Sequence, residues 1–291
     1  MKILNFGSIN KDYVYSVNEF VSPGETIQTS NLKIFIGGKG LNQSVALAQA
    51  GSKVFHAGNI NIKDDYIKKE LIKWNVNIDY IEEVNESTGH AIIQVNKSGE
   101  NSIIIHGGAN RAFESDQIDK VLKNFNQHDI LLIQNEINKI PEIIEKAKNI
   151  GMTIFFNPAP MTKEVLKYPL GLVDYLIVNE SEAKKLSKNN IDFDEIIFDL
   201  KRKYSNSSIL LTIGEKGSIY SNRNEYFKCE AVNVNTVDST AAGDTFIGYF
   251  ISCLSKKKEI KNCLLIASKA ASICVTKKGG AISIPNHKFV I

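Results

Sequence analysis

A run of small residues leads directly into an apolar segment at positions 238–246, which read Asp-Ser-Thr-Ala-Ala-Gly-Asp-Thr-Phe. The first N–H groups of a helix have no partner within the helix, and the helix dipole favours a carboxylate in the first turn. Ala241, Ala242 and Gly243 would therefore form an anion hole with the Asp244 carboxylate at its edge. Donors for a transferring group beside a proton acceptor suit phosphoryl transfer. The simpler alternative is an ordinary helix cap, but a cap does not need small residues ahead of the Asp.

A second glycine-rich turn, Gly-Gly-Lys-Gly at 37–40, stands between a strand-like run and a helix-like run, with Asn42 just after it. Glycines let the backbone approach a ligand closely, and a helix N-terminus attracts anions or polar groups. The turn is not a P-loop, because Lys39 is followed by Gly40 rather than by Ser or Thr. A plain strand-to-helix turn is the alternative, although such a turn requires neither Lys39 nor Asn42.

Polar or glycine-rich turns also follow several other strand-like runs. They contain Asn10 and Asp12, Glu136, the Asn-Pro-Ala-Pro turn at 157–160, Asn179 with Glu182, and Thr212 with Gly214 and Gly217. Each turn alone is explained by a helix cap or a loop. In a parallel sheet, however, they would meet at the edge where open α/β sheets bind ligands. Asn10 and Asp12 suit recognition of hydroxyl groups, and Asn179 with Glu182 suits a metal–phosphate complex.

The elements that would position these residues alternate along the chain. Strands are predicted at 3–6, 54–57, 130–134, 153–156, 175–178 and 209–212. Helices are predicted at 41–50, 64–74, 118–125, 141–150, 194–204, 242–254 and 259–275, and another helix opens at 179–182. This alternation predicts an α/β fold with a mostly parallel sheet and helices on both faces.

Two stretches interrupt the alternation, at about 12–36 and 89–106. The first contains Pro23-Gly24 and no helical pattern, and the second reads as a hairpin with a turn at 97–100. We expect both to pair into a small β-sheet lid that excludes water from a site beneath it. No linker, repeat or low-complexity tract divides the chain, so we expect a single domain over 1–291.

The composition is that of an ordinary globular protein, with 43% of 291 residues hydrophobic. Lys and Arg number 35 and Asp and Glu 32, so the net charge of +3 gives no reason to expect a nucleic-acid or membrane partner. No apolar run approaches the ~18 residues of a membrane helix, and the N-terminus lacks the apolar core of a secretory signal. Cys229, Cys253, Cys263 and Cys274 form no CxxC pair, so we expect reduced, buried thiols and a cytoplasmic location.

Further short blocks accompany the two glycine-rich turns. They are Gly-Ser-Ile-Asn at 7–10, Glu-Ser-Thr-Gly at 86–89, Gly-Gly-Ala-Asn at 107–110 and Asn-Glu-Ser-Glu-Ala at 179–183. In this combination, over nearly the whole chain, the sequence resembles the ribokinase-like sugar kinase family. The resemblance implies a three-layer α/β/α core with a β lid. It also implies ATP as phosphate donor, Mg²⁺, and phosphorylation of the primary hydroxyl of D-ribose to give ribose 5-phosphate.

The resemblance further implies a role for each matching residue. Asp244 would be the general base that deprotonates the sugar hydroxyl, and Ala241, Ala242 and Gly243 would supply the anion hole. The sugar would be held by Asn10, Asp12, Gly38, Lys39, Asn42 and Glu136. The nucleotide would be lined by Asn179, Thr212, Gly214, Gly217 and Gly243. Asn179 and Glu182 would act near Mg²⁺, in part through water.

The same resemblance implies activation by a monovalent cation, usually K⁺, and a homodimer formed through the β lids. The implied cation ligands are Asp238, Thr240, Val275, Lys278, Gly280 and Ser283. Ser239 stands where the family mostly has Thr, and the family's final helix, expected after Pro285, is shortened or absent. Neither departure touches the chemistry that the resemblance implies.

Other functions stay open at this point. A kinase of 2-deoxyribose, fructose or a nucleoside would use the same anion hole. Asn10, Asp12 and Asn42 offer several hydrogen bonds to a polyhydroxylated ring, which favours ribose over deoxyribose. A non-catalytic sugar-binding protein would have no need of Asp244 and Gly243. A Rossmann-type dehydrogenase is excluded, because no strand is followed by G-x-G-x-x-G with a later acidic residue.

Overall fold

The computed structural model of the chain describes residues 1–187 and 192–290, so 188–191 and 291 of the predicted domain lie outside the described residues. The strands of its main sheet are β1 (Ile3–Phe6), β4 (Val54–Asn61), β5 (Asn77–Val84), β8 (Ile130–Gln134), β9 (Thr153–Asn157), β10 (Tyr175–Asn179), β11 (Ser208–Thr212), β12 (Ser218–Ser221) and β13 (Tyr226–Cys229). Their order is β13-β12-β11-β10-β9-β8-β1-β4-β5. Every pair from β11 to β5 is parallel, whereas β12 and β13 are added antiparallel at one edge.

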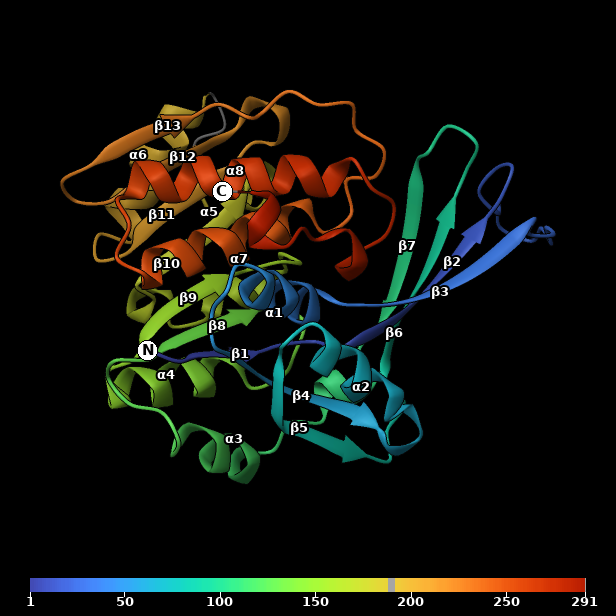
Figure 1. Ribbon diagram of the computed structural model, residues 1–291, viewed down its shortest axis with the longest axis horizontal. Coiled ribbons are helices and arrows are strands. Elements are labelled where there is room, and N and C mark those ends of the chain that lie inside the picture. The colour runs from blue at the N-terminus through green and yellow to red at the C-terminus, as the bar shows by residue number, and fades with distance from the viewer. Residues whose placement is uncertain (188–191, 291) are drawn as a thin grey trace.

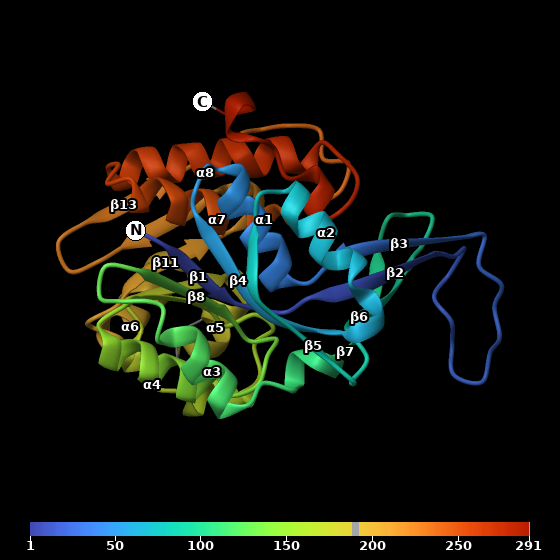
Figure 2. The same ribbon diagram turned by 60° about the horizontal axis from the view of Figure 1, so that its bottom comes forward.

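Helices cover both faces of this sheet (Figure 1). They are α1 (Lys39–Gln49), α2 (Tyr66–Lys73), α3 (Ser115–Leu122), α4 (Ile140–Ile150), α5 (Glu180–Leu186), α6 (Phe193–Lys203), α7 (Ala242–Ser255) and α8 (Ile260–Val275). Helices α1, α2, α7 and α8 pack on one face and α3 to α6 on the other (Figure 2). The predicted three-layer α/β/α architecture is confirmed.

Alternation along the strands divides the apolar residues between two cores. In β1, Ile3 joins the core under α1 and α7, and its neighbour Leu4 joins the core on the opposite face. In β8, Leu132 and Ile133 divide in the same way. Successive side chains of a strand point to opposite faces, so a sheet that is covered twice needs runs that are apolar throughout. This is why the continuous apolar runs in the sequence predicted these strands correctly.

The two interrupting stretches form a second, four-stranded sheet, which we call the lid sheet. It contains β2 (Asn10–Ser16), β3 (Asn31–Gly37), β6 (Gly89–Val95) and β7 (Asn101–His106), in the order β3-β2-β6-β7. The central pair, β2 with β6, is parallel, and the outer pairs are antiparallel. The lid sheet projects from the core, on the right in Figure 1. The predicted pairing of the two insertions is confirmed, and the first begins at Asn10.

Some elements differ from the prediction. Strands β5, β12 and β13 were not expected, because β5 mixes exposed, half-buried and buried residues without a regular alternation and the other two have only four residues each. The helix predicted at 118–125 spans Ser115–Leu122 instead, since residues 123–125 turn toward β8. The cysteines are free and buried, as expected. Among the described residues, no helix is both long and apolar enough to cross a membrane.

Candidate active site

Polar side chains replace aliphatic ones at the last position of four neighbouring parallel strands. They are Gln134 in β8, Asn157 in β9, Asn179 in β10 and Thr212 in β11. Two positions before each stand Leu132, Phe155, Ile177 and Leu210, all members of the core under α1 and α7. Residues two apart in a strand share a face, so the four polar groups form a row facing these helices. The row lies at the carboxyl edge of the sheet, where a site was predicted.

Asp244 lies in the first turn of α7, with 8% of its surface exposed. Both of its carboxylate oxygens accept hydrogen bonds from α1. Asn42 Nδ2 donates to Oδ2 at 3.1 Å, and Gln43 Nε2 donates to Oδ1 at 2.9 Å. The remaining polar atom of Asn42, Oδ1, is buried without a hydrogen-bond partner among the described residues. A free acceptor therefore lies next to the carboxylate.

The turn that begins α7 has a backbone conformation that an ordinary helix cap does not require. Ala241, its N-cap, has a φ of 61°, in the left-handed region that costs an alanine about 1 kcal/mol. The N–H of Ala242 is used within the turn, where it donates to Ser239 O at 3.2 Å. A Cβ built on Gly243 would meet no atom within 4 Å. Of the three predicted anion-hole residues, Gly243 thus faces open space, and Ala242 has its N–H engaged.

Lys39 is half-buried and lies among carboxylates. Burial lowers the pKa of its ammonium group, but the charges of Asp244, Glu136 and Glu182 act in the opposite sense, and the net shift is upward. Glu136 accepts hydrogen bonds from the Lys39 N–H, at 3.0 Å, and from the Ser8 hydroxyl. Burial nevertheless raises the pKa of Glu136. The charge of Lys39 therefore balances a cluster that would otherwise repel an approaching phosphate.

Asn10 and Asp12 come from the first positions of β2, where the lid sheet joins the core. Burial raises the pKa of Asp12 to about 7, and the charges of Glu136 and Asp244 add to this shift. Asn10 Oδ1 accepts a hydrogen bond from Asn110 Nδ2 at 2.8 Å. The two residues share one face of β2, because they are two positions apart. Both line the same cavity as Asp244.

Two cavities meet at the start of α7. The smaller, of about 360 Å³, is lined by Asp244 and by all residues predicted to hold the sugar: Asn10, Asp12, Gly38, Lys39, Asn42 and Glu136. The larger, of about 880 Å³, is lined by all residues predicted for the nucleotide: Asn179, Thr212, Gly214, Gly217 and Gly243. Asn179, Thr212, Ser239 and Gly243 line both cavities. A group that moves from one cavity to the other therefore passes Gly243, with Asp244 beside it.

Comparison with known proteins agrees with this arrangement. The profile of the pfkB family carbohydrate kinases matches residues 1–287. The chain belongs to the pfkB family of carbohydrate kinases. A ribokinase of Staphylococcus aureus is 33% identical over 295 residues, covering 98% of this chain and 96% of the relative. A deoxyribokinase of Salmonella typhi is 31% identical over 294 residues, with coverage of 98% and 96%.

A solved structure shares the whole fold. The Arabidopsis thaliana ribokinase complexed with ribose and ATP matches with a TM-score of 0.86 and 28% identity, covering 99% of this chain and 96% of that one. As a member of the pfkB family, this chain is accordingly a phosphotransferase with an alcohol group as acceptor. Its predicted catalytic, sugar and nucleotide residues line two neighbouring cavities that share lining residues, as such a transfer requires.

In this pfkB kinase, Asn179 and Glu182 form a capping box at the start of α5. Asn179 Oδ1 accepts the Glu182 N–H at 2.9 Å, and Glu182 Oε2 accepts the Asn179 N–H at 2.9 Å. Burial raises the pKa of Glu182. In the described part of the chain, no group of three or more His, Cys, Asp or Glu side chains could hold a metal ion. The donor set therefore fits Mg²⁺ only as an ion held mainly by phosphates and water.

The residues predicted to hold a monovalent cation come from two loops that Asp238 joins. Its carboxylate accepts the Thr240 N–H at 2.9 Å and the Gly279 N–H at 2.9 Å. Burial alone would raise the pKa of Asp238, but these hydrogen bonds lower it. An ionised carboxylate with loop carbonyl groups nearby suits a hard cation. Thr240 and Val275 line the cavities, whereas Asp238, Lys278, Gly280 and Ser283 line neither.

The structure also adds residues that the sequence did not assign. The lid sheet contributes Ala91, Ile93, Asn101, Ile103 and Ile105 to the smaller cavity. Their spacing of two along β6 and β7 was the available signal, since it places them on one face. The larger cavity is lined by several residues of 231–236, among them Val232 and Val234. This segment has no regular structure, so no periodic pattern marked it.

Proposed function

We propose that the chain is an ATP-dependent kinase that phosphorylates the primary hydroxyl of D-ribose, giving ribose 5-phosphate. The observation that carries the proposal is the meeting of the two cavities at Gly243, with Asp244 at the junction. The larger cavity takes ATP, with its phosphates toward the start of α7. The smaller cavity takes the sugar beneath the lid sheet. The existence of a similar protein complexed with ribose and ATP supports a site for each of these two ligands.

Asp244 is the general base in this proposal. Its carboxylate is held in place by Asn42 and Gln43, and it faces the sugar cavity. The sugar hydroxyl donates to Asp244, and the unpaired Asn42 Oδ1 accepts from a neighbouring hydroxyl. As the sugar oxygen attacks the γ-phosphorus, its proton passes to Asp244 and the bond between the γ-phosphorus and the bridging oxygen of ADP breaks.

The charge of the transferring phosphoryl group is met from two directions. The start of α7 directs N–H groups and the positive end of the helix dipole at the junction, and the open space over Gly243 lets an oxygen approach. Lys39 supplies a positive charge from the sugar side. Mg²⁺, when bound with ATP near Asn179 and Glu182, supplies further neutralisation of the phosphates. The lid sheet excludes water, which would compete with the sugar as acceptor.

A monovalent cation between the two loops joined by Asp238 would act on the anion hole indirectly. Thr240 directly precedes Ala241, whose left-handed backbone begins α7, and Asp238 lies three positions before Ala241. A cation held by these loops would fix the turn that presents the anion hole. K⁺ is therefore expected to raise turnover.

The second candidate acceptor is 2-deoxyribose, because a deoxyribokinase is 31% identical to the chain. The sugar cavity is lined by the polar side chains Asn10, Asp12, Lys39, Asn42 and Glu136. A sugar that lacks a hydroxyl leaves one of these buried groups without its partner, which is costly. We therefore expect ribose to be the better substrate.

The test is release of ADP from Mg-ATP with D-ribose, 2-deoxyribose, fructose and adenosine, each with and without K⁺. The highest kcat/KM is expected for ribose, with K⁺ raising the rate. An equal or higher value for another acceptor would overturn the sugar assignment and leave the kinase assignment standing. If no acceptor released ADP but ribose raised the Tm, the chain would be a sugar-binding protein without catalysis.

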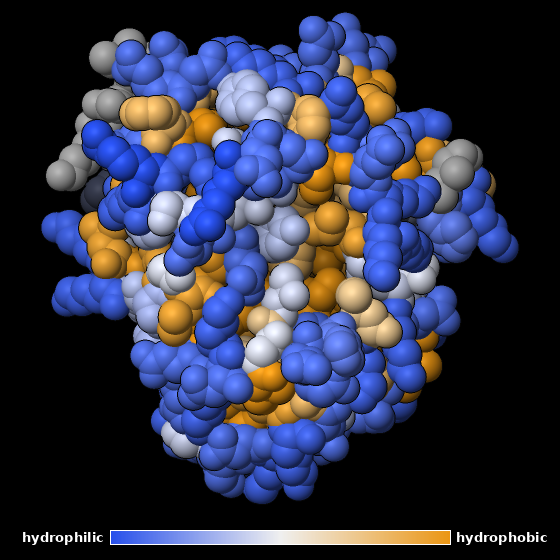
Figure 3. Space-filling view, turned by 90° about the vertical axis from the view of Figure 1, so that its left-hand side faces the viewer, coloured by the Kyte–Doolittle hydropathy of each residue, from blue (hydrophilic) through white to orange (hydrophobic). Residues whose placement is uncertain are grey.

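We further propose that the protein is cytoplasmic, because its free cysteines stay reduced in that compartment. We also propose that two chains pair through the outer face of the lid sheet. Tyr13, Ile34, Ile92 and Ile104 stand in one row across the strands. Ile104 is 64% exposed and Ile34 55%. Hydrophilic residues predominate on the opposite end of the molecule (Figure 3).

Sedimentation of an Ile104→Glu variant tests this pairing. The matched control is Ile72→Glu, because Ile72 on α2 is 55% exposed but lies outside the lid sheet. We expect a dimer for the native chain and the control and a monomer for Ile104→Glu. A native chain that sediments as a monomer at micromolar concentration would contradict the pairing.

A further inference from the structure

Asp244 stands at the end of a chain of buried polar side chains that crosses the sheet edge. Gln43 Nε2 donates to Asp244 Oδ1 at 2.9 Å, and Gln43 Oε1 accepts from Gln134 Nε2 at 2.7 Å. Gln134 Nε2 also donates to Asn5 Oδ1 at 3.0 Å. Asn5 Nδ2 donates to Ser44 Oγ at 2.8 Å. Gln43, Gln134 and Asn5 are completely buried.

The far end of this chain is His56, which is also completely buried. Its Nδ1 lies 2.8 Å from Ser44 Oγ. Burial lowers the pKa of His56 to about 4, so the ring is neutral near pH 7. Because Ser44 Oγ already accepts from Asn5, its own hydrogen is available to His56 Nδ1. This series of hydrogen bonds therefore ends on a neutral acceptor, His56 Nδ1.

The hydrogens of the amide groups fix how these hydrogen bonds run: they are donated outward from Gln134, through Gln43 to Asp244 and through Asn5 to Ser44. Each amide NH₂ has two hydrogens, and in Gln43, Gln134 and Asn5 both are donated. Gln43 Nε2 also donates to Asn157 Oδ1 at 3.2 Å, and Asn5 Nδ2 also donates to Gly40 O at 2.8 Å. If the Gln43 amide were reversed, its oxygen would face the carboxylate of Asp244, and its nitrogen would face the Gln134 nitrogen. Only one orientation of Gln43 is compatible with its neighbours.

The orientation of the Gln134 amide leaves its own oxygen without a hydrogen bond. Its Oε1 is buried without a hydrogen-bond partner among the described residues. An orphaned buried acceptor is uncommon in folded proteins and needs a reason. Reversing the Gln134 amide would place its oxygen against Gln43 Oε1 and Asn5 Oδ1, so two hydrogen bonds would be lost. The orphaned atom is thus the consequence of directing Gln134 Nε2 at Gln43.

We propose that Gln43 is the positioning residue of Asp244, its amide held in one orientation by Gln134 and, behind it, by Asn5, Ser44 and His56. The inference rests on the proposed function, in which Asp244 is the general base. Gln43 fixes one carboxylate oxygen, so the other, which accepts from Asn42 at the sugar cavity, has a defined place relative to the sugar hydroxyl. A small misplacement of a catalytic group is costly in rate, whereas sugar binding depends on other side chains.

The test uses Met, which has nearly the volume of Gln but no donor. Gln43→Met is expected to lower kcat with ribose by about tenfold to a hundredfold, with the ribose KM within about threefold of the native value. Gln134→Met removes the group that orients Gln43, and a smaller fall of kcat, by about threefold to tenfold, is expected. The double variant should be no slower than Gln43→Met, because Gln134 acts through Gln43.

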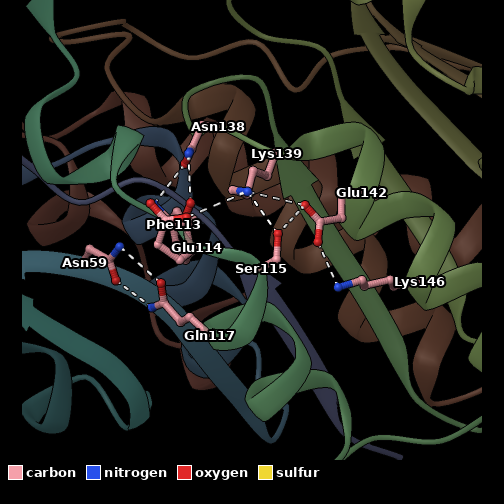
Figure 4. A network of polar contacts seen from close by, with 9 residues as sticks. All are labelled: Asn59, Phe113, Glu114, Ser115, Gln117, Asn138, Lys139, Glu142 and Lys146. Atoms are coloured by element: carbon pink, nitrogen blue, oxygen red, sulfur yellow. Dashed lines mark hydrogen bonds and ion pairs between the residues drawn. The ribbon is translucent and has the colours of Figure 1, made fainter.

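The matched control is Gln117→Met. Gln117 is a buried glutamine of α3 that pairs with Asn59 of β4, donating from Nε2 to Asn59 Oδ1 at 2.6 Å (Figure 4). Neither residue lines either cavity. The control loses a buried amide hydrogen bond in the same kind of setting, so its Tm is expected to fall while its kcat stays at the native value. All rates are measured at a temperature about 15 °C or more below the lowest Tm among the native chain and these variants.

Three outcomes would overturn the inference. They are a native kcat in Gln43→Met, losses that multiply in the double variant, and an equal fall of kcat in Gln117→Met. If Gln43→Met does not fold, Gln43→Asn keeps an amide but ends short of Asp244, and the same loss of kcat is expected. Asp244→Asn is measured alongside. Retained turnover in that variant would remove the proposed base and this inference together, whereas its loss with a native kcat in Gln43→Met would remove the inference alone.

Discussion

Asp12 brings a proton equilibrium close to neutral pH into the sugar cavity, since burial raises its pKa to about 7. Sugar hydroxyls donate to the ionised carboxylate, so bound ribose favours that form. We predict that the ribose KM falls about tenfold from pH 6 to pH 8, as the ionised fraction of Asp12 rises. Asp12→Asn should have a higher KM that no longer follows pH. The measurement is KM at several pH values, and an unchanged slope in the variant would show that another group titrates.

The same shift has a consequence for stability. The folded pKa of Asp12 is raised above its ordinary value of 3.8, so the folded chain holds this proton more tightly than the unfolded chain. The contribution of Asp12 to the free energy of unfolding therefore falls as pH rises from about 4 to about 7. We predict that Asp12→Asn is more stable than the native chain at pH 8, by about 1 kcal/mol or more, and that the gain shrinks toward pH 5. Urea unfolding at the two pH values measures this difference.

At the scale of elements, the site depends on how closely α1 approaches the end of β1. A Cβ on Gly40 would lie 2.3 Å from the Ser8 nitrogen and 2.4 Å from Gly7 Cα. We predict that Gly40→Ala lowers the free energy of unfolding by about 1–3 kcal/mol and lowers kcat, because α1 carries Asn42 and Gln43. Gly171→Ala is the control, since a Cβ there meets nothing within 4 Å. Unfolding and kcat are measured for both; a native kcat in Gly40→Ala would contradict the predicted coupling.

The elements also show what a sequence can predict. The parallel strands and most helices followed from apolar runs and helical spacing, and the residues that end those strands were assigned to the site from their place in the chain. The edge strands β5 and β13 and the four-residue strand β12 have no such pattern, which is why they were missed. The role of Gln43 was out of reach for another reason. Its hydrogen bond to Asp244 joins residues 201 positions apart, and only the folded chain brings them together.

For the whole molecule, His56 links the core to acid stability. Burial lowers the pKa of His56 from 6.5 to about 4, so the unfolded chain binds this proton more readily than the folded chain. Stability from His56 is present above about pH 6.5 and is lost as pH falls toward 4. We predict that the free energy of unfolding of His56→Leu changes less with acid. Between pH 8 and pH 5, the free energy of unfolding of the native chain should fall by about 2 kcal/mol more than that of His56→Leu. Parallel slopes in urea unfolding would contradict this.

The central claim concerns the whole molecule as well, since α7, α1 and the lid sheet meet around a single carboxylate. The most direct test is turnover of ribose by Asp244→Asn, with ribose binding measured by thermal shift in the same preparation. Asn keeps the size of the side chain but cannot take up the proton of the hydroxyl. We predict that ribose still raises the Tm while kcat falls by about a thousandfold or more. Turnover within tenfold of the native value, in a variant that binds ribose, would contradict the assignment of Asp244 as general base.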